Sequence, residues 1–241
     1  MTTLPYTLDQ DDPAIPPIGL VALQTDETIE PEFSRYFRDY EGPLYVTRVP
    51  SGEDVTTETL AAMEANLPAA AALLPAARAF RVVGYGCTSG SSVIGSETVE
   101  AMVKRTCNTE HVTDPLRATV ACAGARGVSR FALLSPYIEE VNATLRAAFA
   151  RQGVSMEVFG TFGVREEAKV VRLSQASIIE AAVTLGRDSA VEAVFLSCTN
   201  LRTIDALHEI EKEIGKPVMS SNQALAWHMR RFVEQNQERT F

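Results

Sequence analysis

The sequence predicts an α/β protein with two pseudosymmetric lobes, each a short parallel sheet flanked by helices, and an active site between the lobes. Three observations predict this fold. Apolar strand-like runs alternate with longer stretches of helical spacing, which is typical of parallel sheets covered by helices. These runs recur at a shift of about 111 residues. Two corresponding runs, one in each half, end in a cysteine followed by threonine.

Each predicted strand of the first half has a counterpart in the second half, which indicates two copies of one βα unit. The aligned runs are residues 18–25 with 130–137, 44–49 with 155–160, and 81–87 with 192–198. A short last strand over residues 216–219 corresponds to the region of residues 106–108. Alanine-rich or charged stretches predict helices at residues 57–78, 138–152, 174–186, 201–215 and 222–235.

These elements divide the chain into two lobes and an arm. We expect the N-terminal lobe to comprise residues 17–111 together with residues 221–241, because the final helix is expected to return to it. The C-terminal lobe is expected to span residues 112–220. Residues 1–16 are rich in proline and acidic side chains and are expected to form an arm.

The composition indicates a globular protein, since 46% of its 241 residues are hydrophobic, which is ample for a packed core. The formal net charge is −9 and no basic face is evident, so nucleic acid and anionic membranes are not expected as partners. The amino terminus does not resemble a secretory signal, and no apolar run approaches the roughly 18 residues of a membrane span. We therefore expect a cytoplasmic protein.

The cysteines carry the functional prediction. Free thiols are expected rather than disulfides, and no Cys-x-x-Cys or His-rich spacing indicates a metal site. Cys87 and Cys198 each follow a buried strand, on the turn that opens a helix, where unpaired N–H groups favour a thiolate and a bound carboxylate alike. A single buried cysteine is usually a packing residue, and Cys107, on a presumed fourth strand, and Cys122 are interpreted in that way.

Two facing thiols can carry out proton chemistry without a cofactor. Removing a proton beside a carboxylate and returning one to the opposite face needs a thiolate and a thiol on either side of a planar enediolate. The enediolate oxygens require preorganised donors, and the candidates are Thr88, Ser89, Tyr137, Thr199 and Asn200. Arg48 and Arg202 are candidates for pairing with substrate carboxylates, and solvated surface roles fit them equally well.

The glycines of residues 84–90 do not indicate a nucleotide site. Their spacing is Gly-x-Gly-x-x-x-Gly, and they follow the third predicted strand instead of the first. Both features differ from a dinucleotide-binding loop. The sequence therefore predicts no cofactor.

The residues resemble the aspartate/glutamate racemase superfamily, in the branch that contains maleate cis-trans isomerase and arylmalonate decarboxylase. The resemblance covers nearly the whole chain and rests on residues 18–21, 87–91, 136–142, 196–199 and 215–221. It implies a two-lobed fold and catalysis without metal, pyridoxal phosphate or nucleotide. It further implies that Cys87 and Cys198 are the catalytic pair and that Thr88, Ser89 and Tyr137 bind the oxyanion. Because relatives often assemble, we also expect a homo-oligomer.

Two residues distinguish this chain within the resemblance. The decarboxylase carries glycine where Cys87 stands, so the presence of Cys87 argues against a simple arylmalonate decarboxylase. Asp26 stands where maleate isomerases have an asparagine that helps to hold a dicarboxylate, and in glutamate racemases an aspartate of this loop assists proton transfer. Asp26 therefore fits a substrate with an amino group, and it would repel the second carboxylate of maleate unless protonated. Residues 25–33 also resemble racemase-like proteins associated with ectoine breakdown.

The leading hypothesis is a cofactor-independent isomerase of a small carboxylate substrate, either a racemase or a cis-trans isomerase, with Cys87 and Cys198 as acid and base. An arylmalonate-decarboxylase-like lyase is the first alternative. A non-catalytic two-lobed carboxylate-binding protein is the second, because such folds also clamp carboxylates between domains.

Overall fold

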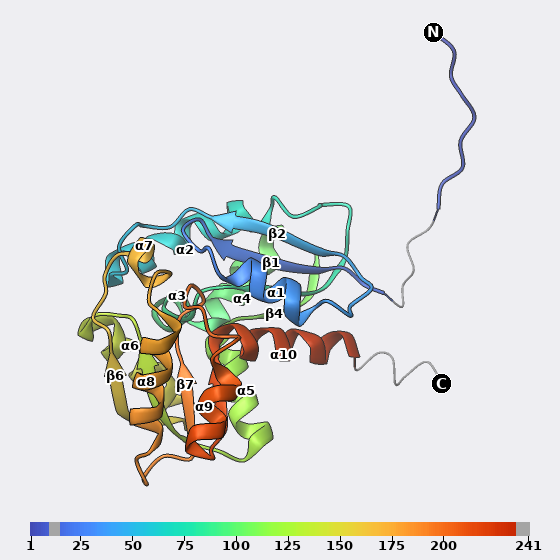
Figure 1. Ribbon diagram of the computed structural model, residues 1–241. Helices are drawn as coiled ribbons and strands as arrows, with labels where there is room; N and C mark the ends of the chain where they lie inside the picture. Colours follow the sequence, from blue (N-terminus) through green and yellow to red (C-terminus); the bar gives the residue numbers. More distant parts are fainter. Residues whose placement is uncertain (10–14, 235–241) are drawn as a thin grey trace.

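Two parallel four-stranded sheets with the same strand order organise the molecule (Figure 1). The structure is a computed structural model that describes residues 1–9 and 15–234. The first sheet has the order β2-β1-β3-β4, and the second has the order β6-β5-β7-β8. The repeated order confirms the predicted α/β fold of two pseudosymmetric lobes.

The first sheet has a buried centre and more exposed edges. β1 (Ile18–Leu23) and β3 (Phe80–Tyr85) are buried almost throughout, because helices cover both faces of the sheet. The edge strands are β2 (Leu44–Val49) and β4 (Thr109–Thr113). The helices between these strands are α1 (Ile29–Tyr36), α2 (Thr57–Ala71), α3 (Thr88–Ile94) and α4 (Ser96–Thr106).

The second sheet repeats this plan. Its central strands are β5 (Arg130–Ser135) and β7 (Ala193–Leu196), and its edges are β6 (Ser155–Thr161) and β8 (Val218–Ser220). The remaining helices are α5 (Pro115–Arg126), α6 (Glu139–Arg151), α7 (Glu167–Val170), α8 (Gln175–Gly186), α9 (Leu207–Ile214) and α10 (Ser221–Glu234).

Three sequence-based placements differ from the structure. Cys107 does not lie on the fourth strand, because it caps the end of α4 and the strand begins two residues later. The helix expected over residues 57–78 ends at Ala71, before Pro75. The helix expected over residues 201–215 begins only at Leu207, because the N–H groups of Thr203 and Ile204 are bonded to the Glu32 carboxylate instead.

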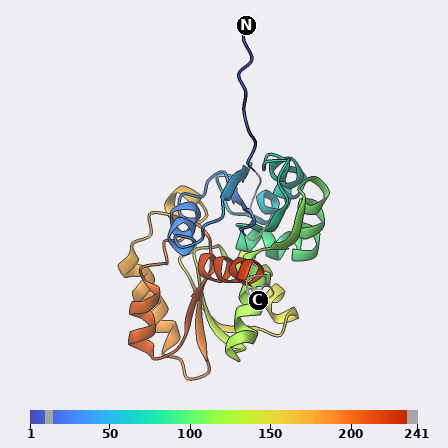
Figure 2. The same ribbon diagram turned by 90° about the vertical axis from the view of Figure 1, so that its right-hand side faces the viewer.

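The final helix, α10, follows the last strand of the second sheet and packs against the first sheet. It lies at the boundary between the two lobes in Figure 2. Leu225 and Met229 are buried in one cluster with Ile18 and Leu20 of β1. A Cβ atom at Gly84 of β3 would lie 2.6 Å from the Met229 sulfur, so glycine permits this close approach of helix and sheet.

Parts of two predicted segments lie outside the described residues. These are residues 10–14 of the predicted arm and residues 235–241 at the end of the predicted N-terminal lobe. Residues 1–9 are exposed and extend away from the lobes (Figure 1). Within the described part of the chain, no helix has the length and apolar character needed to cross a membrane.

The packing of α10 predicts the effect of truncating its central side chain. Met229→Ala should lower the free energy of unfolding by roughly 2–5 kcal/mol, because Met229 is fully buried and its loss leaves a cavity between helix and sheet. Arg231→Ala, on the exposed face of the same helix, is the control and should cost less than about 1 kcal/mol. Urea unfolding measures both changes, and equal effects would contradict this account of the packing.

Candidate active site

Cys87 lies on the turn between β3 and α3. Its backbone is extended, and its sulfur accepts the N–H of Gly90 at 3.1 Å, so that the thiol caps the helix. The Ser89 hydroxyl lies 3.8 Å from the same sulfur. Cys87 is therefore surrounded by donors of the turn, as expected for a thiol at the start of a helix.

Cys198 follows β7 and has a different backbone. Its φ of 110° is the only positive φ of a non-glycine residue among residues 1–9 and 15–234. Such a conformation is strained for an L-residue. A stretch of turns follows until α9 begins at Leu207, so Cys198 does not lie at a helix N-terminus, in contrast to the sequence-based expectation.

The two cysteine turns lie directly against one another. The Thr199 hydroxyl donates to the carbonyl of Gly86 at 3.2 Å, which joins the residue after one cysteine to the residue before the other. Ser221, the first residue of α10, makes a second connection. Its hydroxyl accepts the Cys198 N–H at 3.1 Å and the Thr88 hydroxyl at 2.7 Å. Both thiols are thus presented at one junction between the lobes.

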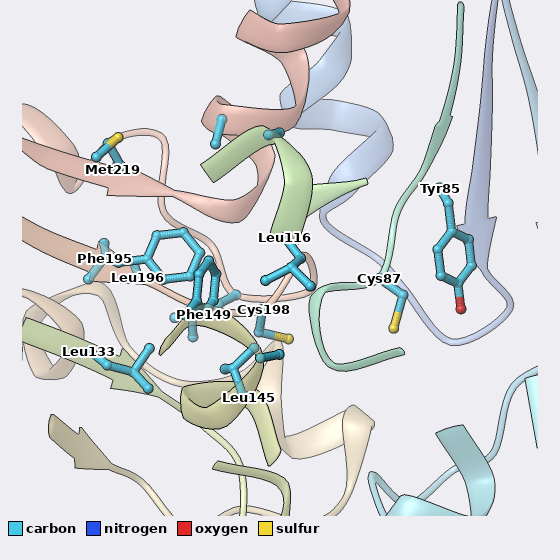
Figure 3. Packing of buried hydrophobic residues seen from close by; sticks show 14 of the residues in the cluster. Tyr85, Cys87, Leu116, Leu133, Leu145, Phe149, Phe195, Leu196, Cys198 and Met219 are labelled. Atoms are coloured by element: carbon cyan, nitrogen blue, oxygen red, sulfur yellow. The ribbon is translucent and has the colours of Figure 1, made fainter. Parts of the chain in front are cut away.

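A buried tyrosine accompanies each thiol. Burial, and then the charges of Cys198 and Cys87, hold the pKa of Tyr137 well above its ordinary value, and burial together with the charge of Cys87 does the same for Tyr85. Asn142 fixes the turn of Tyr137 by donating to its carbonyl at 2.9 Å. In Figure 3, Cys87 lies beside Tyr85, and the Cys198 sulfur points toward the segment that carries Cys87.

Burial dominates the electrostatics of both thiols. It raises the pKa of Cys87 to about 12 and holds the pKa of Cys198 well above its ordinary value, while the Gly90 N–H and the Tyr137 hydroxyl act in the opposite direction. The carboxylate of Glu167 raises both pKa values further. Both thiols are therefore protonated near neutral pH in this structure.

Two buried carboxyl groups act electrostatically on the thiols: Glu167 on both, and Asp26 on Cys198. Asp26 is 2% exposed, and its Oδ1 accepts the N–H groups of Thr28 and Ile29 at 2.8 Å each. Glu167 is 6% exposed, and its Oε2 accepts the Asn200 amide at 2.8 Å. Burial, and then the charge of Asp26, raise the pKa of Glu167 to about 7, against the hydrogen bond from Asn200.

Two loops from different lobes meet at Glu166 and Glu167. Asp54, after β2, pairs with Glu166, after β6, and the neighbouring Glu167 N–H donates to the Glu53 carbonyl at 2.9 Å. A groove of about 590 Å³ runs along these loops and reaches Glu167, and its walls are formed by Gln24, Thr25, Glu27, Glu53, Asp54, Glu166, Glu167, Ala168 and Lys169.

The residues selected from the sequence have several different roles in the structure. The surroundings of the thiols include Asp26, Tyr137, Thr199 and Asn200. The Thr88 and Thr199 hydroxyls, however, donate their hydrogen bonds to other groups of the protein. Arg48 and Arg202 do not face the thiols. Arg48 binds the carbonyls of Leu23, Gln24 and Asp26 and pairs with Glu30, and Arg202 is exposed and binds the Leu173 carbonyl.

Glu167 and Tyr85 were not selected from the sequence. Glu167 lies in a charged stretch, residues 165–169, whose composition is typical of solvated surface. Only its burial in the folded chain identifies it as a candidate site residue. Tyr85 is two residues before Cys87, and this spacing was a usable signal. In the described part of the chain, no group of three His, Cys, Asp or Glu side chains is arranged to hold a metal ion.

Comparison with known proteins relates this chain to one family. A family model described as arylmalonate decarboxylase matches residues 51–240. The arylmalonate decarboxylase of Bordetella bronchiseptica is 33% identical over 106 residues, and the match spans 43% of each chain, which is less than half of that protein. A maleate isomerase of Pseudomonas putida is 24% identical over 186 residues, and that match spans 73% of each chain.

Solved structures share the fold over nearly the whole length. A maleate isomerase from Pseudomonas putida with maleate has a TM-score of 0.81 at 20% identity, covering 91% of this chain and 92% of that one. A maleate cis-trans isomerase from Nocardia farcinica with a covalently bound succinylcysteine intermediate has a TM-score of 0.82 at 24% identity, covering 91% and 93%. These neighbours match the two-lobed architecture described above.

The burial of Glu167 predicts a pH dependence of stability. A carboxyl group whose pKa is about 7 in the fold and 4.5 as its ordinary value stabilises the fold when it is neutral. This contribution is present below about pH 4.5 and is lost as the pH rises through about 7. Between pH 5 and pH 8 the wild type should therefore lose roughly 2–3 kcal/mol relative to Glu167→Gln in urea unfolding. Parallel pH profiles for the two proteins would show that Glu167 is already ionised at pH 5.

The positive φ of Cys198 predicts an unusual order of stability among variants that lack the thiol. Cys198→Gly should be more stable than Cys198→Ala by about 1 kcal/mol, because glycine adopts a φ of 110° without strain. The opposite order is expected at Cys87, whose φ of −149° suits any residue. Thermal unfolding of the four variants measures this, and alanine being the more stable at both positions would argue against strain at Cys198.

Proposed function

The chain belongs to the arylmalonate decarboxylase family, and from this premise we propose that it is a cofactor-independent isomerase of a small carboxylate, with Cys87 and Cys198 as acid and base. The observation that carries the proposal is the contact between the two cysteine turns, one from each lobe. Two thiols at one junction suit a substrate that exchanges protons on opposite faces.

In racemisation, one cysteine as thiolate removes the proton from the α-carbon, and its sulfur becomes a thiol. The electron pair of the broken C–H bond moves into the carboxylate and forms an enediolate. The other cysteine donates its thiol proton to the opposite face, which inverts the α-carbon and leaves a thiolate there. Tyr137, which interacts with both thiols, and the backbone N–H groups of the two turns are suitable donors to the enediolate oxygens.

A cis-trans isomerisation uses the same pair differently. One thiolate adds to the alkene, rotation occurs about the resulting single bond, and the thiolate leaves again. The likeness to maleate isomerases supports this route as an alternative form of the isomerase. Asp26 and Glu167, two buried carboxyl groups that act electrostatically on the thiols, favour racemisation of a monocarboxylate over binding of a second carboxylate.

A decarboxylating lyase is the second candidate function, favoured by the family match and by the relative from Bordetella bronchiseptica. Loss of carbon dioxide from a substituted malonate would leave the same enediolate. One thiol would then suffice to protonate it, so Cys87 would have no necessary part in the reaction.

Solvent deuterium distinguishes these reactions. The wild type, incubated in deuterium oxide with amino acids, maleate and aryl malonates, should incorporate deuterium at the α-carbon of an interconverting substrate. Cys87→Ala and Cys198→Ala should each lower the rate of interconversion at least about 100-fold, because each removes an acid–base group. Cys122→Ala, on α5, is the control and should leave the rate unchanged.

Other results would change the assignment. Conversion of maleate without deuterium incorporation at carbon would remove the racemase route in favour of thiolate addition. Release of carbon dioxide that survives Cys87→Ala but not Cys198→Ala would favour the lyase. Full interconversion by both alanine variants would overturn the role of the thiols.

A further inference from the structure

We propose that Glu32 of α1 is a positioning residue for the Cys198 thiol. Through Asn222, it holds the backbone of Cys198 at its positive φ and so fixes the direction of the side chain. This role rests on the proposed function, in which Cys198 is an acid–base group. Its physical basis is the set of hydrogen bonds around the turn that follows Cys198.

Two consecutive residues of the chain anchor the backbone on either side of Cys198. The Ser221 hydroxyl accepts the Cys198 N–H at 3.1 Å, and the Asn222 amide donates to the Thr199 carbonyl at 2.8 Å. Cys198, at a φ of 110°, lies between these two anchors. A non-glycine residue keeps a strained φ only where its surroundings hold it there, and these anchors are the surroundings that do so.

The Asn222 amide is oriented by a buried carboxylate. Its Nδ2 atom donates to Oε2 of Glu32 at 2.9 Å as well as to the Thr199 carbonyl. Its Oδ1 atom is buried and has no hydrogen-bond partner among residues 1–9 and 15–234. The side chain therefore bonds through its NH₂ group, which has one hydrogen for each of the two acceptors. Without the Glu32 acceptor, the amide could rotate and the Thr199 carbonyl would lose its donor.

Glu32 meets donors at both of its oxygens. It is only 4% exposed, and its Oε1 accepts the N–H groups of Thr203 and Ile204 at 2.8 and 3.0 Å. Its Oε2 accepts the Asn222 amide. Burial raises the pKa of Glu32, and these donors act in the opposite direction. A single carboxylate of α1 thus satisfies the turn after Cys198 at two backbone groups and orients the amide that holds its beginning.

The same bonds keep the segment after Cys198 out of the helix that its sequence predicts. α9 begins only at Leu207, because the N–H groups of the preceding turn are directed to Glu32. Thr28, the residue before α1, adds another bond, since its hydroxyl donates to the Asn200 carbonyl at 3.0 Å. The turn is therefore held by α1 of the first lobe instead of by its own helix. Loss of Glu32 would free these N–H groups and let the thiol move.

The first test measures backbone strain and does not depend on turnover. Cys198→Gly should melt at a higher temperature than Cys198→Ala while Glu32 is present, because of the positive φ. In the Glu32→Gln background this order should reverse, since the released turn lets alanine adopt a negative φ and glycine then only adds flexibility to the unfolded chain. Asn222→Ala should also reverse the order, and it serves as the second background if Glu32→Gln does not fold.

A matched control exists in the same contact. Asp205 is joined to Arg35 of α1 by an ion pair at 2.6 Å, and both side chains are more than half exposed. Asp205→Asn therefore removes a carboxylate that also links α1 to the segment after Cys198, without touching the buried network. In this background, Cys198→Gly should still melt at a higher temperature than Cys198→Ala.

The second test is kinetic and uses a substrate that the wild type interconverts. Glu32→Gln should lower kcat at least about 10-fold and change KM less than about 3-fold, because the thiol is misdirected while the other contacts with substrate remain. Met229→Ala, which removes a fully buried side chain from α10, is the control for lost stability and should keep kcat within about 2-fold of the wild type.

Failure of the positioning role differs from failure of the proposed reaction. An unchanged order of Cys198→Gly and Cys198→Ala in both the Glu32→Gln and Asn222→Ala backgrounds would overturn the positioning role, whatever the reaction. A kcat that falls no further in Glu32→Gln than in Met229→Ala would overturn it as well. A reversed order together with turnover that does not need Cys198 would support the hold of Glu32 on the turn and overturn the proposed reaction.

Discussion

The structure depends on the contact between the two cysteine turns at the junction of the lobes. Each turn follows a central strand of its own sheet. Without this contact, the two cysteines would lie in separate lobes with no connection between them. Ser221, the first residue of α10, is hydrogen-bonded to both turns. Later residues of the same helix pack on the first sheet. One helix therefore joins the last strand of the second sheet, the thiols and the core of the first lobe.

The burial that this contact produces has an electrostatic consequence. Thiols, tyrosines and carboxyl groups lie together out of water, so every charge among them acts strongly on its neighbours. Desolvation favours the neutral form of each acid and keeps the thiols protonated. A proton-transfer site of this kind is controlled by the charge of its ligand, since a bound cation or anion shifts all of these groups together.

The relation to known enzymes is visible in the architecture. The two-lobed fold is shared with maleate isomerase and arylmalonate decarboxylase structures at high TM-scores. Within that common frame, Asp26 and Glu167 form an acidic pair linked by Asn200 to the loop after β1. Substitutions at loop ends change the charge of a site without disturbing the strands, and this allows one fold to serve different substrates.

The patterns along the chain were sufficient for the fold. Strands buried on both faces, a repeat of about 111 residues and helical spacing between the strands predict both sheets, because each signal arises from local periodicity. The patterns failed where distant atoms compete for backbone groups. The helix expected from residue 201 is delayed because Glu32, far away in the sequence, binds the N–H groups of Thr203 and Ile204.

The same distinction applies to the site. The sequence by itself determined the two-lobed fold and singled out Cys87 and Cys198, because strand, repeat and cysteine position are all visible within short segments. Only the tertiary structure decided that Glu167, from an apparently exposed charged stretch, is buried against Asn200 and interacts with Asp26 and the thiols. Which partners a loop residue meets depends on how the two lobes pack, and no local pattern encodes contacts across that separation.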